Sequence, residues 1–278
     1  MIHQSASLIS GSGFYTISIR QGGKGMNQSM HVRPSHAGRI VVVMPAYNAG
    51  ETLTRTYAEI PEGWVDEVIL VDDCSQDNTV DIAKTLKLKC FTHRWNRGYG
   101  GNQKTCYNAA LESGASVIVM LHPDYQYDPT IIPDLVIPII EKRADVVFAS
   151  RFLGNPLKGN MPVYKYVSNR VLTWMQNRIQ GIGLSEYHTG YRAYSAEILQ
   201  AVPYERNSEN FVFDNEIIAQ FLIARARFLE VPVRTRYNPD ASTVSFRGSV
   251  RYGFGVLWTL LRYQLHRWKI ASCRKFDF

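Results

Sequence analysis

Continuous apolar runs alternate with stretches of helical spacing from residue 40 onward. The apolar runs occupy residues 40–44, 67–71 and 115–121. Runs of this kind, without internal alternation, are typical of strands that are buried on both faces of a parallel sheet. Helical spacing follows near residues 51–60, 78–86 and 102–113. This order predicts right-handed βαβ units, and therefore an α/β fold with a mostly parallel sheet flanked by helices.

Further elements extend the pattern toward the C-terminus. Strands are predicted at residues 89–93, 145–150 and 228–236, and helices at 129–142, 161–179, 214–224 and 250–268. Residues 1–38, rich in Ser, Gly and Gln, are predicted to be a flexible leader, with a short edge strand at 14–19 as the alternative. Residues 39–236 would then form the main α/β domain and residues 237–278 a basic amphipathic segment.

Three of the predicted strands end in polar loops. The first runs into Pro45-Ala46-Tyr47-Asn48, the second into Asp72-Asp73-Cys74-Ser75, and the run at 115–121 into His122-Pro123-Asp124-Tyr125-Gln126. In an open parallel sheet such carboxyl ends gather around one crevice. This crevice is therefore the predicted active site.

The third loop offers oxygen ligands for a hard cation. Asp124 and Gln126 stand two residues apart beyond a strand end, so a carboxylate and an amide oxygen are able to face one ion. Mg²⁺ or Mn²⁺ suits such ligands, with phosphate oxygens and water completing the coordination shell. The alternative is that an Asp beside a Pro simply closes a turn.

The acidic stretch after the second strand also has two interpretations. Asp72 and Asp73 are able to bind sugar or base hydroxyls and amides, whereas Asp77 or Asn78 would cap the helix that follows. The glycines that begin at Gly98 predict a tight turn, because the Rossmann spacing and a Walker lysine are both absent.

Composition narrows the classes of ligand without choosing one. The 31 basic and 24 acidic side chains give a net charge of +7, which suits phosphate ligands, anionic membranes or nucleic acid, or is plain surface charge. Nucleic acid is disfavoured because no recognition motif is present and the basic residues cluster with bulky apolar ones. The 4 cysteines lack the spacing of a zinc site and are expected to be reduced thiols of a cytoplasmic protein. Neither a membrane-spanning run nor a signal peptide is expected.

Basic side chains interleave with aromatic and aliphatic ones between residues 246 and 275. Helical spacing there predicts an apolar stripe beside a basic stripe, as in helices that lie on an anionic lipid surface. Many amphipathic helices instead cover their own domain or a dimer partner. Peripheral membrane contact and homo-oligomer formation both stay open as expectations.

Five motifs follow one another in a fixed order along the chain. They are Pro45-Ala46-Tyr47-Asn48, the segment 72–79, the segment 96–100, Asp124-Tyr125-Gln126 and the segment 189–194. In this order they resemble the family 2 glycosyltransferases of the GT-A fold, over about residues 40–251. The resemblance is closest to the branch that contains dolichyl-phosphate mannose synthases and related polyprenyl-phosphate sugar transferases.

The resemblance implies roles for individual residues. One set would bind a nucleoside-diphosphate sugar: Pro45, Tyr47, Asn48, Asp72, Asp73 and Gly98. Pro45, Tyr47 and Asp73 in particular would hold the base and ribose. Asp124 and Gln126 would hold Mg²⁺ or Mn²⁺ on the diphosphate. Three arginines would face the phosphates of the donor or the acceptor: Arg151, Arg192 and Arg247.

Two positions depart from the family pattern. His122 stands where many relatives have the first acid of an Asp-x-Asp motif, and Ala49 stands where many have Glu. His122 is expected either to contact the diphosphate or to pack against the sheet.

The implied reaction is inverting transfer of a hexose to a polyprenyl phosphate at the cytoplasmic membrane face. An ionised lipid phosphate needs no strong base. Transfer to a hydroxyl of a surface glycan is the alternative, and it needs a general base, for which Asp214 is the first candidate and Glu216 the second. Acids at a helix start also simply complement the helix dipole. A nucleotide-sugar-binding protein without turnover is a further alternative.

Overall fold

The computed structural model describes residues 32–154, 163–236 and 246–278, without the side chains of residues 163, 165, 246, 247 and 249. The chain forms two compact units, residues 1–37 and Gly38–Phe278, and the description below concerns the second. The edge strand considered at residues 14–19 and most of the predicted leader lie outside the described residues.

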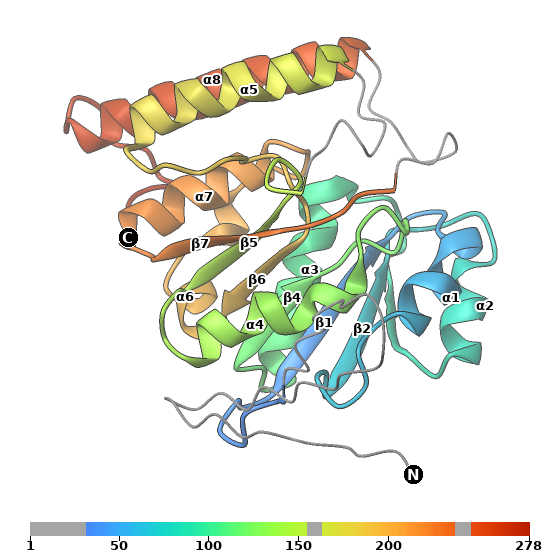
Figure 1. The fold of residues 1–278 in the computed structure, drawn as a ribbon. Coiled ribbons are helices and arrows are strands. Elements are labelled where there is room, and N and C mark those ends of the chain that lie inside the picture. Colours follow the sequence, from blue (N-terminus) through green and yellow to red (C-terminus); the bar gives the residue numbers. More distant parts are fainter. Residues whose placement is uncertain (1–31, 155–162, 237–245) are drawn as a thin grey trace. The chain divides into compact units, whose positions relative to one another are not determined.

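A seven-stranded sheet, in the order β3-β2-β1-β4-β6-β5-β7, forms the centre of this unit (Figure 1). Its strands are β1 Ile40–Ala46, β2 Glu67–Asp72, β3 Lys89–Thr92, β4 Val117–Met120, β5 Val146–Ser150, β6 Arg192–Ser195 and β7 Phe228–Pro232. All neighbouring strands are parallel except at β6, which pairs antiparallel with both β4 and β5. The predicted α/β fold with a mostly parallel sheet is therefore confirmed.

Besides the sheet, the described residues contain eight α-helices and two short 3-10 turns. The helices are α1 Gly50–Ala58, α2 Thr79–Thr85, α3 Gly98–Glu112, α4 Ile132–Ile140, α5 Val163–Gln180, α6 Ala196–Gln200, α7 Phe213–Ile223 and α8 Phe246–Arg267. The 3-10 turns are Pro129–Ile131 and Tyr204–Arg206. Figure 1 shows α4 in front of the sheet and α3 behind it. Apolar residues of α3, α7 and the sheet share one buried core.

Two local predictions were incomplete. The glycines that predicted a tight turn lie in the first turn of α3, which begins at Gly98 rather than near residue 102. The Asp73 carboxylate accepts bonds from the amides of Arg97 and Gly98, so it satisfies donors that a helix start leaves free. The four-residue strand β6 was not predicted, because buried polar residues such as Arg192 interrupt its apolar pattern.

The helices α5 and α8 lie side by side, and α8 also packs against α7 (Figure 1). Neither sequence, Val163–Gln180 or Phe246–Arg267, contains Asp or Glu. Among the described residues, no helix combines the length and the hydropathy that crossing a bilayer requires.

Candidate active site

The loops after β1, β2 and β4 meet at one edge of the sheet, because these strands are parallel neighbours. Each loop holds a non-glycine residue in the left-handed region: Asn48 at φ 50°, Cys74 at φ 65° and Tyr125 at φ 57°. Such conformations cost free energy and concentrate at functional sites. The three polar loops that the sequence predicted to converge therefore follow neighbouring strands, and each of them contains a residue in the left-handed region.

The loop that carries Asp124 is clamped by residues distant in sequence. The Tyr125 ring lies between the guanidinium groups of Arg55 and Arg236, each 4.2 Å from the ring centroid. The Tyr125 hydroxyl donates to Glu59, which also pairs with Arg236 at 2.9 Å. One residue before Asp124, the Pro123 carbonyl accepts a 2.5 Å bond from the Thr52 hydroxyl. Helix α1 and the segment after β7 thus fix the geometry of this loop.

Asp124 is a partly buried carboxylate in an unfavourable environment. Burial raises the pKa of Asp124, although His122 and the Gln126 amide, which donates a 3.0 Å bond to its Oδ1, partly oppose this rise. Within the described residues Asp124 forms no ion pair. A cation beside this carboxylate would relieve the cost of its burial.

The ligands on this loop fit Mg²⁺ or Mn²⁺ that is shared with a substrate. Asp124 and Gln126 carry the carboxylate and amide oxygens that the sequence analysis proposed as ligands, and both are oxygen donors of the kind that these ions prefer. Among the described residues, no group of three or more His, Cys, Asp and Glu side chains is placed to hold an ion. The protein would therefore supply only part of a coordination shell, and a diphosphate and water would supply the rest.

The loop after β1 is tied to the loop after β2. The Asn48 amide donates to the Ser75 hydroxyl at 2.8 Å, and the Asn48 side-chain oxygen accepts from the Gln76 amide at 2.8 Å. Pro45 is buried in register with Val71, while Tyr47 is 54% exposed at the crevice. Of these predicted nucleotide contacts, Tyr47 is the one with a free aromatic face.

The two adjacent acids after β2 have different surroundings. Asp72 is fully buried, and its Oδ2 accepts from the Ser75 amide at 3.0 Å while its Oδ1 has no partner in the described residues. Asp73 is fully engaged by the protein: His93 Nδ1 lies 2.7 Å from its Oδ1, and the Gly98 amide donates to its Oδ2 at 2.9 Å. One carboxylate oxygen of Asp72 is therefore buried without a partner in the described residues, whereas Asp73 binds the Gly98 amide at the start of α3.

A buried cluster beneath the crevice contains the predicted residues Arg192 and Asp214. Their charged groups lie 3.1 Å apart, and Arg192 is 1% exposed. Tyr99 donates to Asp214 Oδ2 at 2.9 Å and Gln103 donates to Asp214 Oδ1 at 3.2 Å. Arg192 also donates to the Tyr187 carbonyl at 3.0 Å. Both oxygens of Asp214 are thus occupied by the protein.

His122 connects this cluster to the metal loop. Its ring stacks on Tyr99, with centroids 5.5 Å apart, and its Nε2 lies 3.5 Å from the Tyr99 hydroxyl. Burial lowers the pKa of His122, so the ring is neutral near pH 7. A Cβ at Gly190 would lie 2.7 Å from His122 Nε2, which explains why glycine occupies this position of the Thr-Gly-Tyr-Arg motif.

The remaining predicted residues lie around the cluster. Glu216 accepts from the Ser208 amide at 2.6 Å and pairs with Lys275 at 2.5 Å, so it ties α7 to the C-terminal tail. Arg151 is held by the fully buried Glu186, with its Nε donating at 2.8 Å. Arg247 lies in the first turn of α8, and its side chain is outside the described set.

Sequence reasoning missed the residues that support the site. Tyr99 and Gln103 hold Asp214, while Arg55, Glu59 and Arg236 hold Tyr125. The only local signal was Tyr99 within the Asn-Arg-Gly-Tyr-Gly motif. The other contacts join segments far apart in the chain, up to 177 residues for Arg236 and Glu59.

Comparisons with known proteins identify the family and several relatives of the chain. The family model described as "Glycosyl transferase family 2" matches residues 41–202. A UDP-N-acetylglucosamine–dolichyl-phosphate N-acetylglucosaminyltransferase of Methanococcus voltae is 28% identical over 81% of this chain and 96% of its own length. An undecaprenyl-phosphate mannosyltransferase of Micrococcus luteus is 27% identical over 82% of this chain and 99% of its own length.

Solved structures show the same fold. Glucosyl-3-phosphoglycerate synthase from Mycobacterium tuberculosis, in complex with Mn²⁺, UDP and phosphoglyceric acid, superimposes with a TM-score of 0.62 at 18% identity. The match covers 82% of this chain and 78% of the synthase. Another complex of that synthase contains Mg²⁺ and UDP.

Proposed function

The chain belongs to glycosyl transferase family 2 and is therefore a glycosyltransferase, and we propose that it transfers a hexose from a nucleoside-diphosphate sugar to a polyprenyl phosphate with inversion at the sugar. A phosphate oxygen of the lipid forms the new bond to the anomeric carbon, while the bond from that carbon to the diphosphate breaks. The nucleoside diphosphate leaves with the electron pair of the broken bond.

The observation that carries the donor side of this proposal is the environment of Asp124. Its burial raises its pKa, and no protein cation pairs with it in the described residues. Asp124 and Gln126 would hold Mg²⁺ or Mn²⁺, which supplies positive charge to the diphosphate as it leaves. The exposed Tyr47 would bind the nucleoside together with Asp72, whose Oδ1 is buried and has no partner among the described residues, and Asp73 would shape the loop around it.

The state of Asp214 favours a phosphate acceptor over a hydroxyl acceptor. A general base needs a carboxylate oxygen free to receive a proton, but both oxygens of Asp214 are engaged by Arg192, Tyr99 and Gln103. Glu216 is engaged by Ser208 and Lys275. A lipid phosphate is already ionised near neutral pH, so it reacts without a base. The names of the two relatives, a dolichyl-phosphate and an undecaprenyl-phosphate transferase, support the same acceptor class.

The exposed face of α5 and α8 supports action at a membrane surface. Their exposed apolar residues are Tyr164, Val167, Val171 and Trp174 on α5, and Val250, Phe254, Leu257, Trp258 and Leu261 on α8. Because neither helix carries an acid, this face suits an anionic lipid surface. The free thiols at Cys74, Cys90, Cys106 and Cys273 suit the cytoplasmic side.

A comparison of acceptors tests the proposal. The protein is incubated with Mn²⁺ and a panel of radiolabelled nucleoside-diphosphate hexoses, together with a polyprenyl phosphate, the unphosphorylated polyprenol or an oligosaccharide. Of the three acceptors, we expect only the polyprenyl phosphate to give a sugar product that extracts into organic solvent. NMR of this product should show that the anomeric configuration of the sugar is inverted. A product on the oligosaccharide or the polyprenol would overturn the acceptor assignment. Donor binding with no product on any acceptor would indicate a binding protein without turnover.

A further inference from the structure

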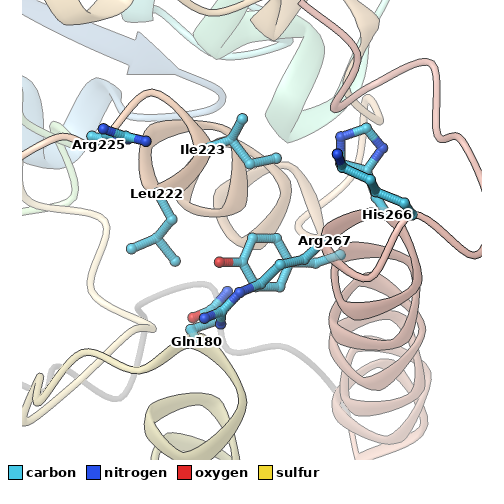
Figure 2. A pocket seen from close by; sticks show the side chains of 8 residues that line it. Gln180, Leu222, Ile223, Arg225, His266 and Arg267 are labelled. Carbon is cyan, nitrogen blue, oxygen red and sulfur yellow. The ribbon is translucent and has the colours of Figure 1, made fainter.

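A second concavity, of about 790 Å³, lies where α5, α7 and α8 end (Figure 2). Its lining comes from the last residue of α5, the end of α7 and the segment 263–269. Helix α7 has 11 residues, so this end lies roughly 16 Å from the end that carries Asp214. The concavity is therefore separate from the catalytic crevice.

The lining of this concavity is strongly basic. Arg225, His266, Arg267 and Lys269 contribute to it, and no Asp or Glu does. His266 Nδ1 accepts from the Cys273 amide at 3.4 Å, which leaves its Nε2 to carry the proton and act as a donor. Such a set of donors and positive charges matches a phosphate group.

A buried amide in the wall is a second and independent indication of a ligand. Gln180 is 5% exposed, and neither its side-chain nitrogen nor its oxygen has a partner in the described residues. A buried amide without partners is costly, so such a group in a native protein indicates a functional or bound partner, such as water, an ion or a ligand. Arg267 and Gln180 both line this concavity (Figure 2). The amide nitrogen is able to donate to a phosphate oxygen, and the amide oxygen is able to accept from a ligand hydroxyl.

The surroundings of the concavity favour a phosphate that is attached to a lipid. Lys269 stands between Trp268 and Ile270, which are 61% and 67% exposed. Earlier in α8, the apolar side chains of Trp258 and Leu261 are also exposed. Basic groups beside exposed aromatic and aliphatic groups are typical of contact with lipid headgroups and acyl chains.

We propose that this concavity is a binding site for the headgroup of an anionic phospholipid, a phosphodiester that carries a free hydroxyl, such as phosphatidylglycerol. Arg267 and Lys269 bind the phosphate, Gln180 binds the hydroxyl and phosphate oxygens, and Trp268 and Ile270 enter the acyl region. The site holds a lipid that is not a substrate, and it does not depend on the identity of the sugar donor or acceptor.

The first experiment separates a specific site from general surface charge. Binding of the full chain is measured to vesicles of phosphatidylcholine, with and without phosphatidylglycerol. The variant Arg267→Gln/Lys269→Gln is compared with Arg170→Gln/Arg178→Gln, which removes the same charge from exposed positions of α5 outside this concavity. Removal of any two basic side chains near an anionic membrane is expected to weaken vesicle binding by about tenfold or more. We expect Arg267→Gln/Lys269→Gln to weaken vesicle binding several-fold more than Arg170→Gln/Arg178→Gln does. Equal weakening in the two variants would overturn the proposal.

A charge-neutral variant gives the sharper test. Gln180→Leu removes the unpartnered amide, so we expect a thermal midpoint that is unchanged or higher, together with about a threefold to tenfold weaker preference for phosphatidylglycerol. An unaltered preference would overturn the role of Gln180. Glycerol 3-phosphate and inorganic phosphate are titrated in parallel by thermal shift. Stabilisation by these probes without a preference among vesicles would overturn the lipid assignment in favour of a soluble phosphate.

Failure of this inference is distinguishable from failure of the proposed function. Sugar transfer to a detergent-dispersed polyprenyl phosphate does not require vesicle binding, so we expect Arg267→Gln/Lys269→Gln to keep the wild-type rate in detergent. A large loss in detergent would contradict the separation of the two sites.

Discussion

Two carboxylates beneath the same crevice differ in what the protein places around them. Asp214, 7% exposed, lies against the guanidinium of Arg192 and accepts bonds from Tyr99 and Gln103. Asp124 receives only the amide of Gln126 and lies beside the neutral His122, and its pKa is raised by burial. Within the part of the chain that the structure describes, one carboxylate is neutralised by an arginine and the other has no counter-charge.

We interpret this difference as a division of tasks between the two groups. A buried charge that the protein pairs is a structural element, because loss of either partner leaves the other uncompensated. A partly buried charge that the protein does not pair is able to recruit a cation from outside. Proximity to the crevice alone would have made both residues catalytic candidates. The distribution of partners separates them.

The largest expected effect is on the paired carboxylate. Arg192→Met should lower the free energy of unfolding by about 3–5 kcal/mol, because it leaves Asp214 buried without its cation. Chemical denaturation measures this change. The double variant Arg192→Met/Asp214→Leu should regain much of the lost stability. A loss well below 1 kcal/mol in the single variant would contradict the view of a tightly coupled pair.

The unpaired carboxylate should respond in the opposite way. Asp124→Asn should reduce sugar transfer by about two to three orders of magnitude, because the diphosphate loses its metal. Its free energy of unfolding should stay the same or rise, since burial of the charge is unfavourable. Transfer assays and denaturation on the same preparation test both statements. Normal transfer by this variant would reject the metal assignment.

The pH dependence of stability should distinguish wild type from Asp124→Asn. The pKa of Asp124 in the folded protein lies above its ordinary value of 3.8, so the folded state keeps this proton to higher pH than the unfolded chain does. Without metal, wild type should therefore lose stability relative to the variant as the pH rises through the raised pKa. Thermal midpoints at several pH values measure the difference. Added Mn²⁺ with a nucleoside diphosphate should stabilise wild type and not the variant.

The smallest expected effect concerns the clamp around the metal loop. Tyr125→Phe removes the hydroxyl that donates to Glu59 but keeps the ring between Arg55 and Arg236. We expect a loss of about 1 kcal/mol in unfolding free energy. We also expect a weaker apparent affinity for Mn²⁺, measured by titration in the presence of a nucleoside diphosphate. An effect on stability alone would show that the hydroxyl does not position the loop.

Much of the fold followed from local pattern. Strands β1 and β4 are buried at every position, and β2 is buried from Ile69 to Asp72, so the apolar runs were enough to predict these strands without knowledge of the neighbouring strands. Strand β6 was missed because its place between β4 and β5, and with it the burial of Arg192, depends on pairing with strands about 45 to 75 residues away. A polar residue in a short strand is uninformative until its partners are known.

The sequence by itself determined the family, the order of the motifs and the convergence of three strand ends, and it was enough to propose Asp124 and Gln126 as oxygen ligands. These features depend on residue type and short spacing. Only the tertiary structure decided that Asp214 is paired with Arg192, that Asp73 accepts bonds from the start of α3, and that Gln180 has no side-chain partner among the residues the structure describes. The reason is physical: the charge state and availability of a side chain depend on its burial and its partners, and those partners come from distant parts of the chain.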